Sequence, residues 1–349
     1  MDLYNLGRVP WQESQLLYHA LAHLDKEALV LVSPAQPYVC IGFHQDAEQE
    51  VDLAFCREQG IPVFRRDVGG GAVYLDGDQL FFQLILHRDN PVIPKRKEAF
   101  YQKFLEAVIR VYRRLGIEAV YKPINDVIVE RRKISGTGAA EIGDCIVFVG
   151  NLIVDFNYDM MCRILKVPDE KFRDKVHKTL FENLSTIRRE LGEEEASKWD
   201  DTTLNAMMAE EFETLLGAME PRGKDAALQA KMDELGAKML PEAWTLLNSK
   251  KRTAGRDVKI RAGASMVHRM HKAVGGLIRA DFEILEDRFG RVHLSGDFFC
   301  YPETAVGELE SELAGTPVDH LKETLERYYE KSGVDTPGIE IEDWIRVLS

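Results

Sequence analysis

Residues 65–76 read Arg65-Arg66-Asp67-Val68-Gly69-Gly70-Gly71-Ala72-Val73-Tyr74-Leu75-Asp76, with a strand-like run on each side of three adjacent glycines. Each glycine in an extended segment costs about 0.5–1 kcal/mol relative to alanine, so such a run usually serves the close approach of a backbone or a ligand. Arginines present planar donor forks that suit carboxylates and phosphates. The segment therefore predicts an anion cradle of glycine amides and arginines, although composition alone also allows a tight bend with surface arginines.

The segment differs from the common phosphate-binding loops. No Gly-Lys-Ser/Thr follows the glycines, which excludes a P-loop, and a strand rather than a helix follows them, which excludes a dinucleotide fingerprint. We expect the cradle to lie on a hairpin-like pair of strands, 61–66 and 72–75.

A second informative segment contains Asn125-Asp126 and then Lys133-Ile134-Ser135-Gly136-Thr137-Gly138-Ala139-Ala140. A lysine at the start of a short apolar strand could neutralise an attacked carboxylate or its phosphate. Asn125 and Asp126 end an extended run and could hold Mg²⁺ or orient a nucleotide. Taken alone, a solvated turn lysine is the common alternative.

The rest of the chain alternates between strand and helix patterns. We expect helices at 13–24, 52–58, 99–115, 305–313 and 318–330, a charged helical region at 169–247, and strands at 28–32, 38–42, 80–86, 146–156, 276–284 and 291–295. A chain of 349 residues favours two α/β domains, with a boundary in 241–256.

Charge and composition exclude several functional classes. The net charge of −13 argues against a nucleic-acid partner, and the sequence has neither a signal peptide nor an apolar run long enough for a membrane helix, so we expect a cytoplasmic protein. Cys40, Cys56, Cys145, Cys162 and Cys300 are widely spaced, which favours buried thiols over a metal or disulfide framework. We expect His268 and His271 to form a surface pair rather than a metal site.

Together, the two segments resemble the lipoate-protein ligase A family, in its two-domain form within the biotin/lipoate ligase superfamily. The family pattern has an Arg-Arg-x-Ser-Gly-Gly-Gly-Ala-Val-Phe loop, then Asn-Asp, then Lys-Ile-Ser-Gly-Ser-Ala. In this chain the pattern is matched by Arg66 to Tyr74, Asn125-Asp126 and Lys133 to Ala139. The resemblance extends through Gly150-Asn151-Leu152-Ile153 and reaches Leu294 to Phe299 near the C-terminus.

The resemblance implies an α/β (α+β) fold with a mixed, mostly antiparallel sheet flanked by helices, as in biotin ligases and class II aminoacyl-tRNA synthetases. It also implies a catalytic domain at 1–248 and a small α/β accessory domain at 257–349. In related ligases the accessory domain helps to activate lipoate and rotates between the two half-reactions. The stretch 169–186 lies where the family has a mobile loop over the adenylate.

The activity implied by the resemblance is activation of lipoate by ATP and Mg²⁺ to lipoyl-AMP, followed by transfer to a lysine of a carrier. The carrier would be an E2 lipoyl domain, a glycine-cleavage H protein or a similar protein. Lys133 is the expected catalytic residue, and Asp126 is the candidate Mg²⁺ ligand. The expected ATP- and lipoyl-AMP-binding residues are Arg66, Gly69, Gly70, Gly71, Ala72, Val73, Tyr74, Asn125, Asp126, Lys133, Ser135, Gly136, Thr137 and Gly150.

The chain departs from the family pattern at Val68, which replaces a serine, at Val149, which replaces a frequent histidine, and at 43–46, which lack the usual arginine. Two other functions stay open at this point. One is an octanoyl- or lipoyl-transferase of the same fold with a cysteine nucleophile, for which Cys145 and Cys162 are the candidates. The other is a non-catalytic lipoate-binding assembly protein.

Overall fold

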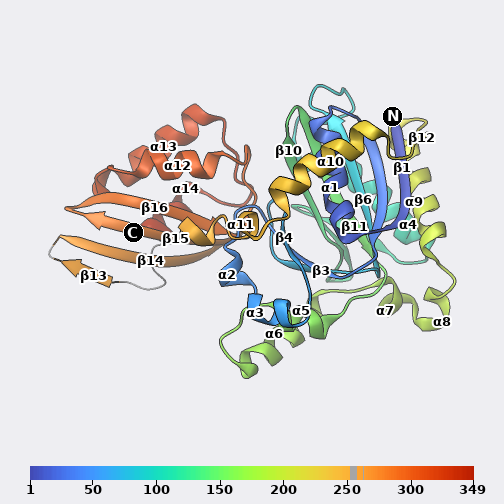
Figure 1. Ribbon diagram of the computed structural model, residues 1–349, viewed down its shortest axis with the longest axis horizontal. Coiled ribbons are helices and arrows are strands. Elements are labelled where there is room, and N and C mark those ends of the chain that lie inside the picture. Colours follow the sequence, from blue (N-terminus) through green and yellow to red (C-terminus); the bar gives the residue numbers. More distant parts are fainter. Residues whose placement is uncertain (252–257, 262) are drawn as a thin grey trace. The chain divides into compact units, whose positions relative to one another are not determined.

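The computed structural model describes residues 1–251, 258–261 and 263–349 (Figure 1). The expected start of an accessory domain at residue 257 lies outside the described residues, as does part of the expected boundary at 241–256. The chain folds into two compact units, and each unit combines several segments. The first unit comprises Met1–Cys40, Ala54–Phe64 and Val73–Leu240, and the second comprises Ile41–Leu53, Arg65–Ala72 and Pro241–Ser349.

A six-stranded sheet forms the centre of the first unit, in the order β10-β11-β6-β2-β1-β12 (Figure 1). The strands are β1 (Asp2–Val9), β2 (Ala28–Pro34), β6 (Gln79–His87), β10 (Thr137–Ile142), β11 (Cys145–Ile153) and β12 (Glu220–Pro221). The pairs from β10 to β2 are antiparallel, whereas β1 is parallel to both of its neighbours. The expectation of a mixed, mostly antiparallel sheet is confirmed.

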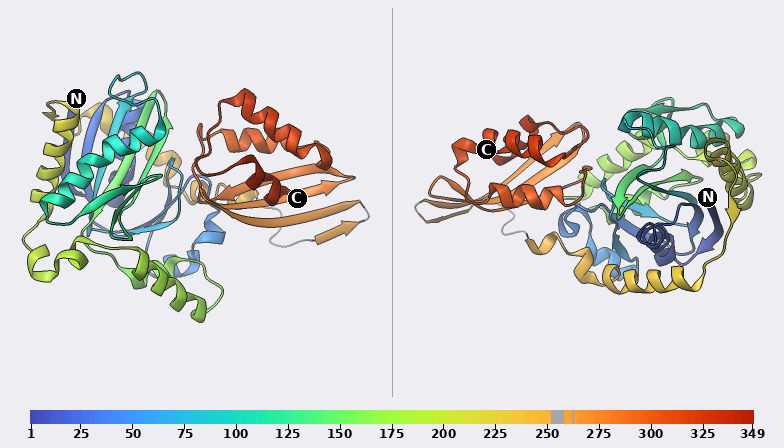
Figure 2. Two further views of the ribbon diagram at one scale, coloured as in Figure 1. Left: turned by 180° about the vertical axis from the view of Figure 1, so that it is seen from behind. Right: turned by 90° about the horizontal axis from the view of Figure 1, so that it is seen from above.

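Two pairs of helices flank this sheet (Figure 2). Helices α1 (Trp11–His23) and α10 (Ala226–Met239) pack together on one face, and α4 (Lys97–Arg114) and α9 (Asp201–Leu216) pack together on the other. The apolar positions of α4 recur at helical spacing, and the buried stripe they form packs in the main hydrophobic core. Shorter helices complete the unit, namely α3 (Leu53–Glu58), α5 (Tyr158–Ile164), α6 (Glu170–Asn183), α7 (Ile187–Leu191) and α8 (Glu193–Ala196).

Two small sheets carry the segments singled out in the sequence. One has the order β4-β3-β5, formed by β4 (Val63–Arg65), β3 (Tyr38–Ile41) and β5 (Val73–Leu75). Because β3 lies between β4 and β5, the expected hairpin-like strand pair around the glycines is wrong. The glycines instead connect two strands that flank a third.

The other small sheet is a meander of β7 (Ala119–Lys122), β8 (Asp126–Val129) and β9 (Arg132–Ser135). Asp126 begins β8 and Asn125 lies in the turn before it, so the expectation that the two residues end an extended run is wrong. The antiparallel register of β8 and β9 pairs Ile128 with Lys133. This pairing brings the part of the segment that contains Asp126 together with the part that begins at Lys133.

The C-terminal part of the second unit is a four-stranded antiparallel sheet with helices on one face (Figure 1). Its elements are β13 (Val258–Arg261), β14 (Ala264–Ala273), β15 (Gly276–Leu285), β16 (Arg288–Gly296), α12 (Ala305–Leu313), the 3-10 turn Val318–His320, α13 (Leu321–Ser332) and α14 (Ile341–Leu348). The unit also contains α2 (Ala47–Glu50), α11 (Glu242–Thr245) and the 3-10 turn Ser249–Lys251.

The two histidines of β14 do not form the surface pair that we expected. Successive side chains of a strand point to opposite faces, so residues three apart lie on opposite sides of the sheet. His268 Nδ1 lies 2.8 Å from Asp281 Oδ1, and His271 Nε2 lies 2.7 Å from Asp343 Oδ1. Each ring is thus paired with a carboxylate of its own.

Among the described residues, the helices are too short or too polar for any of them to cross a lipid bilayer.

Candidate active site

Lys133 lies in the first unit with its side chain about one-third exposed, and Asp126 is its ion-pair partner. The ammonium Nζ lies 2.7 Å from Asp126 Oδ1, and the two side chains are 36% and 27% exposed. The main chain of Lys133 is held separately, because its carbonyl accepts a hydrogen bond of 2.8 Å from the Ser185 amide just beyond α6. The backbone is therefore fixed while the ammonium can still reach solvent or a ligand.

The turn before β8 is fastened to the start of β10. Asn125 donates from its side-chain amide to the Thr137 carbonyl at 2.7 Å, and the Thr137 hydroxyl donates to the Asn125 carbonyl. This reciprocal pair brings the predicted residues Asn125 and Thr137 together close to Asp126 in the chain. It positions the turn that directly precedes Asp126, whose carboxylate faces Lys133.

Two buried polar residues that are not among the predicted binding residues connect other predicted positions. Asn151 accepts from the Gly136 amide at 2.8 Å through its side-chain oxygen, and it donates to Gln79 at 2.9 Å. Gln79 in turn donates to the Tyr74 carbonyl at 3.2 Å. Both are nearly inaccessible, at 7% and 1% exposure. A polar side chain within an otherwise apolar strand is the sequence signal that could have revealed them.

Gly150 must be a glycine because other groups approach its backbone closely. A Cβ atom at this position would lie 2.4 Å from Phe82 Cζ and 2.9 Å from the Gly136 carbonyl oxygen. The neighbouring Ser135 is fully buried and donates its hydroxyl to the Asn151 carbonyl at 2.6 Å. These residues shape the strand that carries Lys133.

The glycine run and Arg66 belong to the second unit, where Arg66 donates to the run itself. Its Nη2 lies 2.7 Å from the Gly69 carbonyl oxygen and 3.0 Å from that of Gly71. The Gly70 amide donates to the Phe298 carbonyl at 3.3 Å. Ala72 ends this segment, and Val73 and Tyr74 continue it in the first unit as β5, with Val73 exposed and Tyr74 buried.

Arg65 does not contribute to an anion cradle, which corrects the expectation that both arginines do so. Its side chain is completely buried, and burial lowers the pKa of its guanidinium to about 10. The guanidinium donates at 2.6–3.1 Å to five main-chain carbonyls, those of Gly42, Phe43, Gln45, Trp244 and Thr245. Arg65 therefore fastens segments of the second unit to one another.

Comparison with known proteins adds evidence for the family. The family model described as the lipoyl protein ligase A/B catalytic domain matches residues 8–213. The chain belongs to this family.

The relatives of the chain include ligases and transferases. Lipoate–protein ligase 1 of Staphylococcus aureus is 25% identical over 338 residues, which cover 94% of this chain and 89% of that protein. The octanoyltransferase LipM of Kyrpidia tusciae is 24% identical over 231 residues, or 60% of this chain and 82% of that protein. The family thus includes members that are named for either activity.

A solved structure described as a bipartite lipoate protein ligase of Thermoplasma acidophilum, with its E2 lipoyl domain, shares the fold. It superimposes with a TM-score of 0.62 at 27% identity and covers 70% of this chain and 95% of that one. The expected ligase-like fold is thereby confirmed.

The expected use of ATP and Mg²⁺ raises the question of a metal ligand. The described part of the chain contains no group of three or more histidine, cysteine or carboxylate side chains placed to hold a metal ion. Mg²⁺ commonly binds through one or two carboxylates together with substrate phosphates, so a dedicated protein cage is not needed. Asp126 could supply one such carboxylate if its ion pair with Lys133 opened.

All five cysteines are buried, as expected. Burial raises the pKa of the Cys145 thiol to about 11, and burial followed by the charge of Asp159 also raises the pKa of Cys162. Cys162 nevertheless lines an open pocket of about 480 Å³ beside α6, together with Asp159, Arg163, Arg173, Asp174 and His177. None of the predicted ligand-binding residues lines this pocket.

Proposed function

We propose that this chain is an ATP-dependent lipoate-protein ligase with Lys133 as its catalytic residue. The observation that carries the proposal is the state of the Lys133 ammonium, which is held on a fixed strand, one-third exposed, and paired with Asp126. A positive charge in this state can exchange a carboxylate partner for the oxygens of an acyl phosphate. The proposal includes the binding roles of the residues from Arg66 to Tyr74 and from Asn125 to Gly150 that the sequence predicts.

The proposed chemistry has two steps. A carboxylate oxygen of lipoate attacks the α-phosphorus of ATP, which forms the acyl–phosphate bond and releases pyrophosphate. The amine of a carrier lysine then attacks the acyl carbon and forms an amide bond; the acyl carbon–oxygen bond to the phosphate breaks, AMP leaves with the bonding electrons, and the amine proton is released to solvent. Both steps build negative charge on phosphate and carbonyl oxygens, and a fixed cation stabilises such charge more strongly in the transition state than in the ground state. Lys133 can serve both steps without forming a covalent bond.

The proposed partner is a lipoyl carrier, such as an E2 lipoyl domain, an H protein or a similar small protein. The Thermoplasma relative supports this choice, because its solved structure is described together with an E2 lipoyl domain. We further propose that residues 1–248 form the catalytic domain and residues 257–349 an accessory domain that assists adenylation. ATP and Mg²⁺ complete the proposed set of ligands.

A cysteine-dependent octanoyltransferase is the second candidate function, since one observation favours it. Cys162 and His177 line the same pocket, and His177 Nε2 lies 3.1 Å from Asp159 Oδ1, so the three residue types of a cysteine–histidine–carboxylate site occur together. Against it, the Cys162 residue is only 2% exposed and burial raises the pKa of its thiol, which disfavours the reactive thiolate.

Exchange of labelled pyrophosphate into ATP distinguishes the two candidates. A ligase forms lipoyl-AMP reversibly, so we expect exchange that requires lipoate and needs no carrier. A transferase takes its acyl group from an acylated protein and has no step that involves ATP. Absence of lipoate-dependent exchange in purified protein, with octanoyl transfer between carriers present, would replace the ligase by the transferase.

A further inference from the structure

The end of β16 and the turn after it lie directly against the glycine run, within the second unit. A Cβ atom on Gly69 would lie 2.8 Å from the Phe298 carbonyl oxygen and 3.0 Å from Phe299 Cδ1, and one on Gly70 would lie 3.2 Å from Phe299 Cζ. At position 69 the Phe298 and Phe299 main chain leaves no room for a side chain, and at position 70 a side chain would displace the Phe299 ring. The glycines at 69 and 70 therefore accommodate a protein neighbour from the C-terminal part of the chain.

The contact fixes one peptide plane of the run at both ends. The Gly69 carbonyl accepts from Arg66, and the Gly70 amide of the same peptide donates to the Phe298 carbonyl. The carbonyl and the amide of a trans peptide point in opposite directions, so two partners on opposite sides prevent its rotation. A third constraint comes from Gly42, where a Cβ atom would overlap the Gly70 carbonyl oxygen at 1.9 Å.

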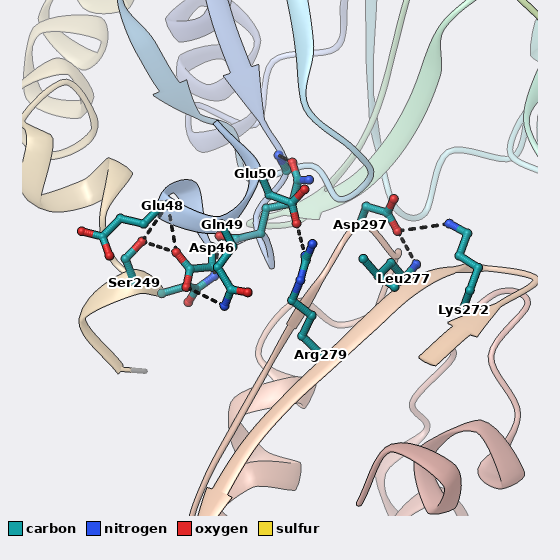
Figure 3. Close-up of polar contacts among 12 residues, drawn as sticks. Asp46, Glu48, Gln49, Glu50, Ser249, Lys272, Leu277, Arg279 and Asp297 are labelled. Atoms are coloured by element: carbon teal, nitrogen blue, oxygen red, sulfur yellow. Dashed lines mark hydrogen bonds and ion pairs between the residues drawn. The ribbon is translucent and has the colours of Figure 1, made fainter. Parts of the chain in front are cut away.

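The segment that contains Gly42 is itself tied to the C-terminal sheet. Arg279 of β15 forms an ion pair with Glu50 of α2, and their side chains are only 10% and 15% exposed (Figure 3). His44 stacks on Phe298 with ring centroids 5.1 Å apart, and its carbonyl accepts from the Gly296 amide at 3.0 Å. Segments 41–53 and 65–72 are thus both held in place by contacts with the C-terminal sheet and the turn after β16.

The turn that presents Phe298 and Phe299 is braced by its own contacts. Asp297 accepts from the Leu277 amide and lies 3.7 Å from the Lys272 ammonium (Figure 3). Phe298 is completely buried, with its ring edge-on to Trp344 at 5.6 Å. A turn held in this way can impose its position on the loop that it touches.

We infer that the Phe298–Phe299 turn and the Arg279–Glu50 ion pair are positioning elements that set the conformation of the glycine run. The inference rests on the proposed function for its consequence, which is that the C-terminal region contributes to adenylation by fixing the main-chain groups near the nucleotide phosphates. Phe299 and Arg279 act through the run and do not themselves bind the substrate.

Two substitutions in the full-length protein test the inference, each with a matched control. Phe299→Ala removes the ring above Gly69 and Gly70, and Val306→Ala removes a buried side chain of the C-terminal core that is not among the nearest neighbours of these glycines. Arg279→Met breaks the buried ion pair, and Arg327→Met breaks an exposed pair with Glu312 in the same unit. We expect all four proteins to fold, which retained hydrogen-exchange protection of β15 would verify.

The first measurement is hydrogen–deuterium exchange without any ligand. We expect amides 66–72 to exchange at least tenfold faster in Phe299→Ala and Arg279→Met and at the wild-type rate in both controls. Wild-type exchange of these amides in Phe299→Ala overturns the inference. If amides 66–72 exchange equally fast in Val306→Ala, the inference is also overturned, because general loosening of the C-terminal core would then explain the faster exchange.

The second measurement is the kinetics of lipoate-dependent pyrophosphate exchange. We expect the KM for ATP to rise at least fivefold in Phe299→Ala, with the KM for lipoate within twofold of wild type and partial recovery in Phe299→Leu. An unchanged KM for ATP despite a loosened run overturns the link to adenylation. If the wild-type protein shows no such exchange, the proposed function fails, while hydrogen exchange still decides whether the turn positions the run.

Discussion

Lys133 and the glycine run are the two principal contributors predicted for the site, and the chain restrains them in different ways. The Lys133 ammonium has Asp126 as its ion-pair partner and remains one-third exposed. The glycine run is held through its main chain by Arg66, Phe298 and the close approach of Gly42. A charge that must change partners during a reaction is held weakly, whereas groups that supply a fixed geometry are held by several buried neighbours.

The largest effect is expected where the weakly held charge is removed. Lys133→Ala should lower the rate of lipoate-dependent pyrophosphate exchange by about 10²–10³-fold, the range typical for the loss of one group that stabilises developing charge. The unfolding temperature should change little, because a partly exposed ion pair contributes little to stability. Lys122→Ala is the matched control, since Lys122 is an exposed lysine of the same small sheet. If Lys133→Ala retains pyrophosphate exchange, Lys133 is not a catalytic charge, and its contrast with the glycine run has no functional meaning.

The next largest effect concerns the rigidly held run. Gly42→Ala places a methyl group against the Gly70 carbonyl oxygen, so the run must shift, at a cost of about 1–3 kcal/mol in unfolding free energy. We expect a lower denaturation midpoint together with a higher KM for ATP. Gly307→Ala in α12 is the control, because a Cβ atom there meets no neighbour within 4 Å. If the two variants behave alike, the run tolerates movement and the two regions do not differ as described.

A pH effect on stability is expected beside the run, at His44. Burial, and then the charges of Arg65 and Lys251, lower the pKa of His44 to about 3. The unfolded chain takes up a proton near pH 6.5 and the folded chain does not, so stability is present above that pH and is lost as the pH falls toward 3. The loss should approach about 1.4 kcal/mol per pH unit.

His44→Phe keeps a ring that can stack on Phe298 and removes the titration. Denaturant unfolding between pH 7 and pH 4 should therefore show a shallower decline in this variant than in the wild type. Parallel declines would mean that His44 becomes protonated without unfolding, and that the surroundings of the run are less rigid than we describe.

A smaller effect is expected for the partner of Lys133. Asp126→Asn keeps the size of the side chain but removes the countercharge, so the ammonium loses the ion pair that orients it. We expect pyrophosphate exchange to fall about tenfold, equivalent to about 1.4 kcal/mol. A fall as large as that of Lys133→Ala would show that Asp126 acts directly, for instance as a Mg²⁺ ligand. Titration of activity with Mg²⁺ would separate these two roles.

No effect on ligation is expected from the cysteines. Changing Cys145 and Cys162 together to alanine should leave lipoate-dependent exchange and carrier modification within about twofold of wild type, because a ligase uses no thiol nucleophile. Mass spectrometry of the carrier measures the second activity. If the double variant still folds but no longer transfers the acyl group, the transferase is favoured, and a cysteine rather than Lys133 would be the catalytic residue.

Several elements were predictable because their residues carry a periodic pattern. The helical spacing around 99–115 corresponds to α4, and the apolar runs at 80–86 and 146–156 correspond to β6 and β11. Strand β12 has only two residues, and so short a segment carries no periodicity to detect. The position of β3 between β4 and β5 also has no local signal, because strand order depends on long-range pairing.

The candidate site was predictable in its residue types but not in its pairings. The sequence predicts both Lys133 and Asp126 as site residues, yet their ion pair depends on the register of β8 and β9, which the sequence does not fix. Arg65 and Arg66 are adjacent and chemically identical, but one is buried among carbonyls and the other donates to the glycine run. Only the folded backbone distinguishes their roles.

The five hydrogen bonds of Arg65 limit where this polypeptide could be divided into two chains. Its acceptors lie at residues 42–45 on one side and 244–245 on the other. A break before Pro241 would leave a buried guanidinium and two of its acceptors on separate molecules, which could be satisfied only by association. A break after Lys251 would keep all five bonds within one polypeptide, so a functional two-subunit version of this enzyme should be easier to obtain by dividing the gene there.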